Sequence, residues 1–208
     1  MKKIITILIL FLIYTFMCAY SYANTISSDL SDNVFRLHVI ANSDSDEDQH
    51  LKYIIRDKLI EYMNTISINL TSKEDVIKVA KEHLDDFYNI AYNTIKENGY
   101  DYSVNINIGN FYFPTKTYGD ISFPTGYYDA LKVEIGEAKG QNWWCVLFPP
   151  LCFVDVSSGI VPDSSKEIMK ENMNEEDYNI ISEDTNEIKF KFKLIEMFQN
   201  AKILTAKN

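Results

Sequence analysis

The spacing of apolar residues changes at Gly99, and this change determines the class of fold. Before Gly99, apolar residues recur every three or four positions over 51–66 and again over 76–95, which is typical of one face of a helix. After Gly99, apolar and polar residues alternate over 102–108, which is typical of a strand with one solvated face. Two helices are therefore followed by a strand-rich half.

Four more strands are expected around the helical pair. Their ranges are 34–41, which precedes the helices, and 111–117, 127–135 and 143–148, which follow them. Turns that contain glycine or proline separate the later strands. This order predicts an α+β domain, in which two N-terminal helices pack on a mostly antiparallel sheet.

Polar residues mark where the two helices begin and end. Ser45 is an expected N-cap, because Asp48 follows it by three residues as in a capping box. Thr71 and Glu74 repeat this spacing before the second helix. Gly99 then supplies the left-handed residue that ends the second helix.

Two further segments follow the core domain, which is expected to span 24–156. Residues 157–186 are polar and acidic with few large apolar side chains, and they predict a loop or linker. Residues 187–208 fit both the alternation of a strand and the stripe of a helix. Their content of Glu, Lys, Leu, Met and Gln favours a C-terminal helical segment that docks on the core.

The N-terminal segment is apolar from residue 4 to residue 20 and follows the basic pair Lys2 and Lys3. Ser21 and Ala23 then give the small-x-small pattern of a signal peptidase site, so 1–23 reads as a signal peptide cleaved after Ala23. This stretch of 17 residues, apolar except for Thr6 and Thr15, also approaches the length that spans a bilayer, and an uncleaved anchor stays open. Both interpretations place the rest of the chain outside the cytoplasm.

The charge of the remaining segment argues against two classes of partner. Without residues 1–23 the chain keeps 18 basic and 30 acidic residues, a formal net charge of −12. Such a charge disfavours nucleic acid, which is bound mainly by neutralising phosphates. It also disfavours anionic lipid, so membrane contact is expected only through the signal or anchor segment.

No metal or cofactor site is expected from the sequence motifs. Asp44, Asp46 and Asp48 superficially resemble a calcium loop, but Gln49 and Ile55 occupy the positions that require glycine and glutamate. The three histidines lack zinc spacing, and there is no phosphate-binding glycine loop. The aspartates are therefore interpreted as a solvated helix cap.

Residues 143–148 are apolar at every position, so both faces of this strand are apolar. The strand is either central and covered on both sides, or it exposes an apolar patch for a partner. Pro149 and Pro150 cannot continue a central strand and must turn the chain. This turn brings Cys145 and Cys152 near each other.

The two cysteines form a candidate disulfide, because an oxidising compartment favours pairing. Closing a loop this short would stabilise the fold by roughly 2–3 kcal/mol on the loop-entropy estimate. Two buried thiols are the first alternative. A catalytic Cys145 is the second, and it would need an imidazole from His38, His50 or His83, none of which the spacing ties to it.

Three stretches together resemble one protein family. They are residues 36–57 (RLHVIANSDSDEDQHLKYIIRD), residues 113–155 with the run GQNWWCVLFPPLC, and residues 191–198 (KFKLIEMF). These motifs resemble the stage II sporulation protein R signalling proteins of endospore-forming Firmicutes. The Trp-Trp-Cys run is too unusual to arise from composition alone.

This resemblance implies a function that the residues alone do not reveal. It implies an exported signalling protein that crosses the forespore membrane into the space between forespore and mother cell. There it would activate a membrane aspartic protease of the stage II sporulation protein GA type, which processes the sigma-E precursor. The chain would then be a ligand and not an enzyme; a secreted cysteine-dependent cell-wall hydrolase is the alternative.

Aromatic residues dominate interaction hot spots, and they dominate protein cores as well. The expected partner contact or scaffold is therefore the strand and turn formed by Trp143, Trp144, Phe148, Pro149 and Pro150. The second candidate is the turn that contains Asn42, Ser43 and Asp44.

Overall fold

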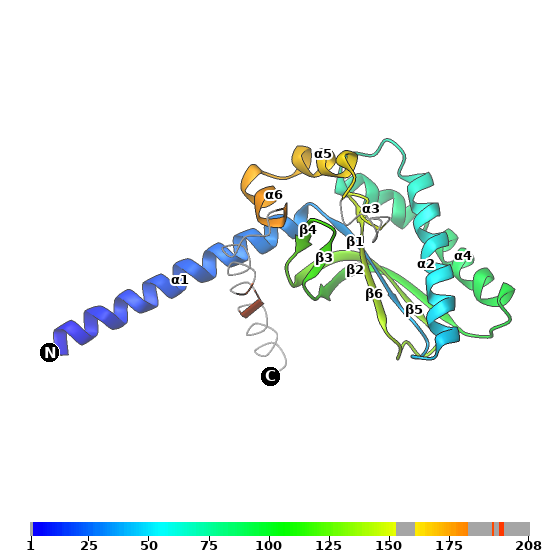
Figure 1. The fold of residues 1–208 in the computed structure, drawn as a ribbon, viewed down its shortest axis with the longest axis horizontal. Coiled ribbons are helices and arrows are strands. Elements are labelled where there is room, and N and C mark those ends of the chain that lie inside the picture. Colours follow the sequence, from blue (N-terminus) through cyan, green and yellow to red (C-terminus); the bar gives the residue numbers. More distant parts are fainter. Residues whose placement is uncertain (1, 153–160, 183–192, 194–195, 198–208) are drawn as a thin grey trace.

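A computed structural model describes residues 2–152, 161–182, 193 and 196–197 of the chain. The helix α1 extends away from a body in which the other elements pack together (Figure 1). The elements are, in chain order, α1 (Lys2–Asp32), β1 (Phe35–Ile40), α2 (Asp46–Ile66), α3 (Lys73–Glu82), α4 (Leu84–Glu97), β2 (Val104–Phe113), β3 (Lys116–Tyr118), β4 (Ile121–Phe123), β5 (Gly126–Ile135), β6 (Asn142–Phe148), α5 (Asp163–Asn172) and α6 (Glu175–Ser182).

The main sheet has four strands in the order β2-β5-β1-β6. The strand β1 runs parallel to β5 and antiparallel to β6, while β2 runs antiparallel to β5. The strands β3 and β4 form a separate antiparallel pair. The prediction of an α+β fold with a mostly antiparallel sheet is confirmed.

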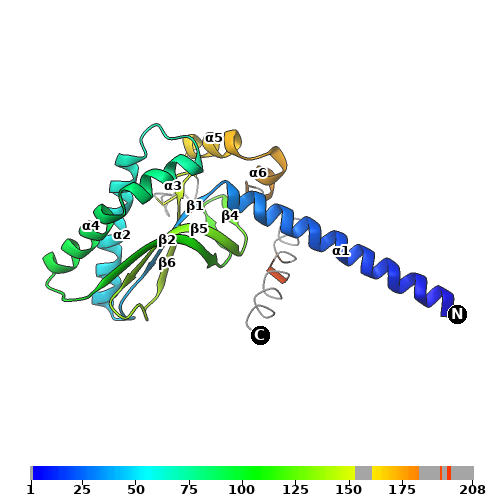
Figure 2. The ribbon, with the colours of Figure 1, turned by 180° about the vertical axis from the view of Figure 1, so that it is seen from behind.

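One face of the sheet is apolar and lies under helices. Leu37 pairs with Leu131 on one side and with Cys145 on the other, so these three side chains share a face. They belong to a core that includes Ile55 of α2 and Phe87 of α4, both fully buried. Figures 1 and 2 show α2 and α4 along this side of the sheet.

The opposite face has a second core at one end only. There Phe113, Phe123 and Tyr128 pack with Leu30 of α1 and Met169 of α5. The last third of α1 is thus part of the body, since Leu30 is fully buried. The β3–β4 hairpin and the helices α5 and α6 lie at this end of the sheet (Figure 1).

The predicted helix over 51–66 is confirmed as α2. Its N-cap is confirmed too, because the Ser45 side chain accepts a hydrogen bond from the Asp48 amide. The second predicted helix is two helices, α3 and α4, which join at His83. Its N-cap is Ser72 and not Thr71, because the Ser72 hydroxyl accepts the hydrogen bond of the Asp75 amide. The apolar stripe continues across the junction, and periodicity alone could not locate the break.

Two other expectations about elements are corrected. Strand β2 runs without interruption through residues expected to separate two strands. The described part of 157–186 is mainly helical and not a loop, since α5 and α6 place Met169 and Ile180 in the second core. The few apolar residues of this segment lie on the buried side of short amphipathic helices, which an average over composition does not detect.

The predicted C-terminal segment, 187–208, lies mostly outside the described residues. Lys193, Glu196 and Met197 are described, and they are helical. Docking of this segment on the core stays a prediction, as do the proposed boundaries of the segments.

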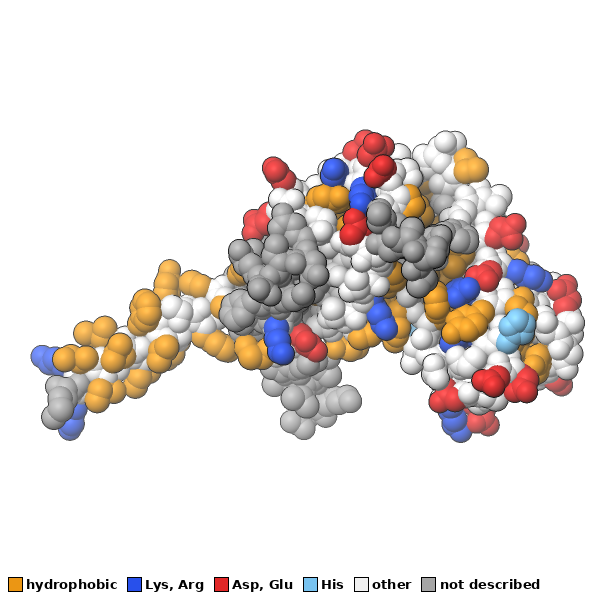
Figure 3. Space-filling view, in the orientation of Figure 1, with side chains coloured by type: hydrophobic (Ala, Val, Ile, Leu, Met, Phe, Trp, Pro, Cys, Tyr) orange, Lys and Arg blue, Asp and Glu red, His pale blue; other side chains and the backbone are white. Residues whose placement is uncertain are grey.

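Within the described residues, α1 is the one helix long and apolar enough to cross a membrane, a test that signal sequences also pass. Its apolar side chains from Ile4 to Met17 are exposed, and Figure 3 shows them covering the part that extends from the body. This helix fits the expected signal or anchor segment.

Candidate functional site

The Trp-Trp-Cys run forms β6, which is an edge strand and not the central strand considered above. Of the described strands, β1 alone pairs with β6, and the chain itself occupies part of the outer edge of β6. The Leu151 amide donates to the Val146 carbonyl at 3.1 Å, and the Tyr118 hydroxyl donates to the Trp144 carbonyl at 3.2 Å. Residues 145–148 are buried because helices cover one face and the second core covers the other.

The two tryptophans of β6 point to opposite faces of the sheet. Trp143 lies on the helical face, where it meets the Tyr53 ring edge-on at 5.6 Å and the Arg56 guanidinium lies 4.1 Å from its ring centroid. Trp144 lies on the other face and stacks on His38, with ring centroids 3.6 Å apart. Both indoles are half-buried, so each is a scaffold element with an accessible part. A role in contacting a partner stays a prediction.

The turn after β6 is also packed into the body. Phe148 and Pro149 are buried, whereas Pro150 is exposed. The Ser165 hydroxyl of α5 donates to the Pro150 carbonyl at 2.8 Å and fixes the turn against that helix. Of the five candidate contact residues in this segment, Pro150 alone is exposed.

Cys145 and Cys152 are joined by a disulfide that closes this turn, with Cα atoms 5.4 Å apart. Cys145 is almost fully buried in the core under the helices. A buried sulfur in a disulfide is not available as a nucleophile, which weighs against the hydrolase alternative.

Asn42, Ser43 and Asp44 form the turn between β1 and α2, here called the 42–44 turn. Its side chains bond within the protein. The Asp48 carboxylate accepts hydrogen bonds from the Asn42 amide at 2.8 Å and from the Ser43 hydroxyl at 2.5 Å. Burial opposes ionisation of Asp48, but the hydrogen bonds from Ser43 and Asn42 outweigh it and hold the pKa below its usual value.

The 42–44 turn also contacts the loop that connects β5 to β6. The Glu137 amide donates to the Asn42 side chain at 2.9 Å, and the Gln141 amide donates to the Asp44 carboxylate at 2.7 Å. Gly140 passes so close to the Ser43 carbonyl that an added Cβ would clash with it. The motif therefore ties two turns together, and its role in partner contact stays a prediction.

A row of mostly polar side chains crosses the face of the sheet opposite α2 and α4, and no sequence motif indicated it. In register across all four strands, Asn107 pairs with Lys132, Lys132 with His38, and His38 with Trp144. The next row brings Asn105, Glu134 and Asn142 to the same face. Alternation within β1 could have shown that Arg36 and His38 share a face. Their cross-strand neighbours could not be inferred, because they come from distant parts of the sequence.

His38 is the buried centre of this row. Its Nε2 lies 2.6 Å from the Asn142 side-chain oxygen, and Lys132 next to it forms an ion pair with Glu134 at 2.6 Å. Burial, supported by the positive charge of Lys132, lowers the pKa of His38 to about 4. The imidazole is therefore neutral at physiological pH and acts as a packing surface for Trp144.

Arg36 lies two residues before His38 and is fully buried. Its guanidinium lies 4.2 Å from the ring centroid of Phe113 and 4.7 Å from that of Tyr128, both at cation–π distance. One nitrogen donates to the Tyr118 hydroxyl at 2.8 Å, while Nε and Nη1 find no hydrogen-bond partner among the described residues. Arg36, the first residue of the motif in residues 36–57, thus stabilises the second core through its contacts with aromatic rings.

Within the part of the chain that the structure describes, no group of three or more His, Cys, Asp or Glu side chains is placed to hold a metal ion. The arrangement consists of rigid turns, a half-covered sheet face and grooves between elements.

Comparison with known proteins gives two matches. Residues 31–158 match the family described as Stage II sporulation protein R. The chain is also similar to the protein named Stage II sporulation protein R of Bacillus subtilis (strain 168), with 42% identity over 130 residues. This similarity covers 62% of the chain and 58% of the relative, so the chain spans less than two thirds of the relative's length. No solved structure shows a significant match.

Proposed function

Because the chain belongs to the stage II sporulation protein R family, we propose that it is an exported signal that activates a membrane aspartic protease during sporulation. The protease is of the stage II sporulation protein GA type and processes the sigma-E precursor in the mother cell. The chain acts from the space between forespore and mother cell. The family match over residues 31–158 carries this proposal.

Two structural features support the proposal. The helix α1 begins with Lys2 and Lys3 and continues with an apolar stretch, which is the arrangement of an export signal or membrane anchor. The matched range also contains the 42–44 turn and all of β6. These two parts of the body are the candidate partner contacts or scaffold. The body is thus a rigid domain, cross-linked by the Cys145–Cys152 disulfide, that can act as a ligand.

The mechanism is a shift between two states of the protease. A ligand activates a protein only if it binds the active state more tightly than the inactive one. Coupling energies of about 1–3 kcal/mol are typical and correspond to roughly 5–150-fold changes in affinity. The domain therefore needs a surface that fits one protease state.

Complementation in a spore-forming host that lacks its own copy of the gene tests this function. The full chain restores processing of the sigma-E precursor, whereas a chain that begins at Asn24, without an export segment, fails when made in the forespore. Processing is followed by immunoblot. A full chain that is exported and folded yet leaves the precursor uncut would disprove the proposal.

Paired substitutions separate the ligand from a cysteine hydrolase. If the two cysteines act only as a bridge, Cys145→Ser and Cys152→Ser reduce stability and precursor processing to the same extent. A nucleophilic Cys145 would instead make Cys145→Ser lose hydrolysis of cell-wall fragments while Cys152→Ser kept it.

A further inference from the structure

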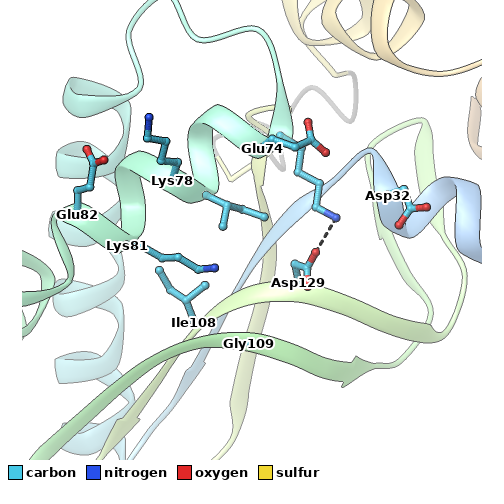
Figure 4. A pocket seen from close by; sticks show the side chains of 10 residues that line it. Asp32, Glu74, Lys78, Lys81, Glu82, Ile108, Gly109 and Asp129 are labelled. Atoms are coloured by element: carbon cyan, nitrogen blue, oxygen red, sulfur yellow. Dashed lines mark ion pairs between the residues drawn. The ribbon is translucent and has the colours of Figure 1, made fainter.

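A groove of about 770 Å³ lies between α3 and strands β2 and β5, beside the end of α1. Ile77 of α3 and Ile108 of β2 give it an apolar lining, and Gly109 of β2 also borders it. Figure 4 shows the Lys81 side chain extending from α3 over Ile108. The groove is separate from β6 and from the 42–44 turn.

Two lysine side chains of the groove lie near one carboxylate, that of Asp129. Lys73 is buried and forms an ion pair with Asp129 at 2.7 Å. Lys81 adds a second ammonium group near the same carboxylate, and its charge helps to lower the pKa of Asp129. Among the described residues, the Lys81 ammonium group forms no hydrogen bond or ion pair, whereas the Lys73 ammonium group bonds to Asp129 and to the Ser31 carbonyl. One carboxylate therefore faces two cations.

The rim of the groove limits how acidic a ligand can be. Asp32, Glu74 and Glu82 line the rim, and Lys78 is the one additional cation there. In Figure 4, Glu82 and Lys78 point away from the strands. A ligand with many acidic groups would be repelled by the rim, whereas a single carboxylate that reaches Lys81 would be attracted.

The groove lies along an open edge of the sheet. Of the strands that the structure describes, β5 alone pairs with β2, so the outer edge of β2 is available for another strand. The opposite edge strand, β6, is partly occupied by bonds from Leu151 and Tyr118. An unpaired edge offers main-chain hydrogen bonds to an extended peptide.

We propose that this groove binds an extended segment of the partner protein, which adds a strand to β2. The segment places an aliphatic side chain on Ile77 and Ile108 and a single carboxylate on Lys81. This inference rests on the proposed function, in which the partner is the extracytoplasmic part of the membrane protease. Main-chain pairing supplies affinity, and the two side chains supply specificity.

The test compares Lys81→Glu with Lys78→Glu in the full chain, because both lysines are exposed on α3 and only Lys81 points over the groove. Binding to the detergent-solubilised protease is measured by titration, and circular dichroism confirms the fold of each variant. Lys81→Glu weakens binding by about tenfold or more, the low end for a reversed interface charge. Lys78→Glu stays within about twofold, and Lys81→Arg keeps most of the affinity.

The outcomes separate the groove from the function. If the unaltered chain binds the protease, and Lys81→Glu binds as well as Lys78→Glu, the groove is not the binding site and the proposed function stands. Equal weakening by both substitutions means a general charge effect and also overturns the groove. If the unaltered chain neither binds nor activates the protease, both proposals fail.

Discussion

The indole of Trp144 stacks on the imidazole of His38, with ring centroids 3.6 Å apart and ring planes inclined by 21°. The two residues are direct cross-strand neighbours on β6 and β1. Phe113 meets both rings, at 4.7 Å from Trp144 and 5.9 Å from His38. Trp144, the second tryptophan of the Trp-Trp-Cys run, therefore stabilises the half-covered face of the sheet.

Removing this contact should cost stability and release His38. Trp144→Ala is expected to lower the free energy of unfolding by about 3 kcal/mol, the low end of the range for a core tryptophan, because Trp144 is half-buried. The pKa of His38, now about 4, should rise toward its ordinary value because water reaches the ring. Urea unfolding and NMR titration measure the two effects. An unchanged His38 pKa in a folded Trp144→Ala variant would show that Trp144 does not bury the imidazole.

The carboxyl group of Asp177 gives a prediction about pH. Burial, together with the negative charge of Asp29 on α1, raises the pKa of Asp177 to about 6. The folded state thus favours the protonated form, while the unfolded chain has a pKa of about 3.9. The contribution of Asp177 to stability should therefore be greatest below pH 4 and fall as pH rises through 6.

Replacing this carboxyl by an amide tests the prediction. Asp177→Asn keeps an acceptor for the Asn174 amide and should be more stable than the unaltered chain at pH 7.5. The difference should shrink toward pH 4.5, as measured by chemical unfolding at both values. An equal difference at the two pH values would mean that Asp177 does not titrate in this range.

Gly140 is predicted to be among the least replaceable glycines, because an added Cβ would clash with the Ser43 carbonyl. Gly140→Ala should therefore lower the free energy of unfolding by about 2 kcal/mol or more, as expected for overpacking at a rigid site. Gly99→Ala is the matched control, since Gly99 has φ +82° but no atom within 4 Å of the added Cβ. The control should cost about 1 kcal/mol through backbone strain alone. A smaller loss for Gly140→Ala than for Gly99→Ala would contradict the close approach of the two turns.

Truncation at the N-terminus should show where the folded body begins. A chain that starts at Asn24 keeps Ile26 and Leu30, which are buried in the second core, and should unfold cooperatively. A chain that starts at Val34 loses both residues, at a cost of about 2–5 kcal/mol for each large apolar side chain. Thermal unfolding compares the two chains, with Leu30→Ala as an intermediate. Equal stability of both truncations would mean that α1 does not contribute to the core.

The helices and most strands could be predicted because their periodicity is local. The sheet order could not, because β1 pairs with β5 and β6, which lie about 100 residues further along the chain. For this reason the sequence leaves open whether residues 143–148 form a covered central strand or expose an apolar face, and the structure shows β6 at the edge of the sheet. The helices α5 and α6 were missed because Met169 and Ile180 are isolated apolar residues in an acidic segment.

The candidate site, too, could be predicted from the sequence only in part. The Trp-Trp-Cys run and the 42–44 turn stand out in the sequence, but their internal partners, such as Glu137 for Asn42, are non-local. The groove at Lys81 has no motif at all, since it arises where α3 crosses an open strand edge. Sequence patterns thus identified the unusual motifs. Which of their residues are accessible, and where the groove lies, can be seen only in the three-dimensional structure.

Reconstitution tests the central claim most directly. Vesicles carry the membrane aspartic protease and its sigma-E precursor, and the domain that begins at Asn24 is added to the extracytoplasmic face. We predict that the precursor is cut when the domain is present, and that cutting is much slower with buffer or a denatured domain. A folded domain that leaves the rate of precursor cleavage unchanged would contradict the account.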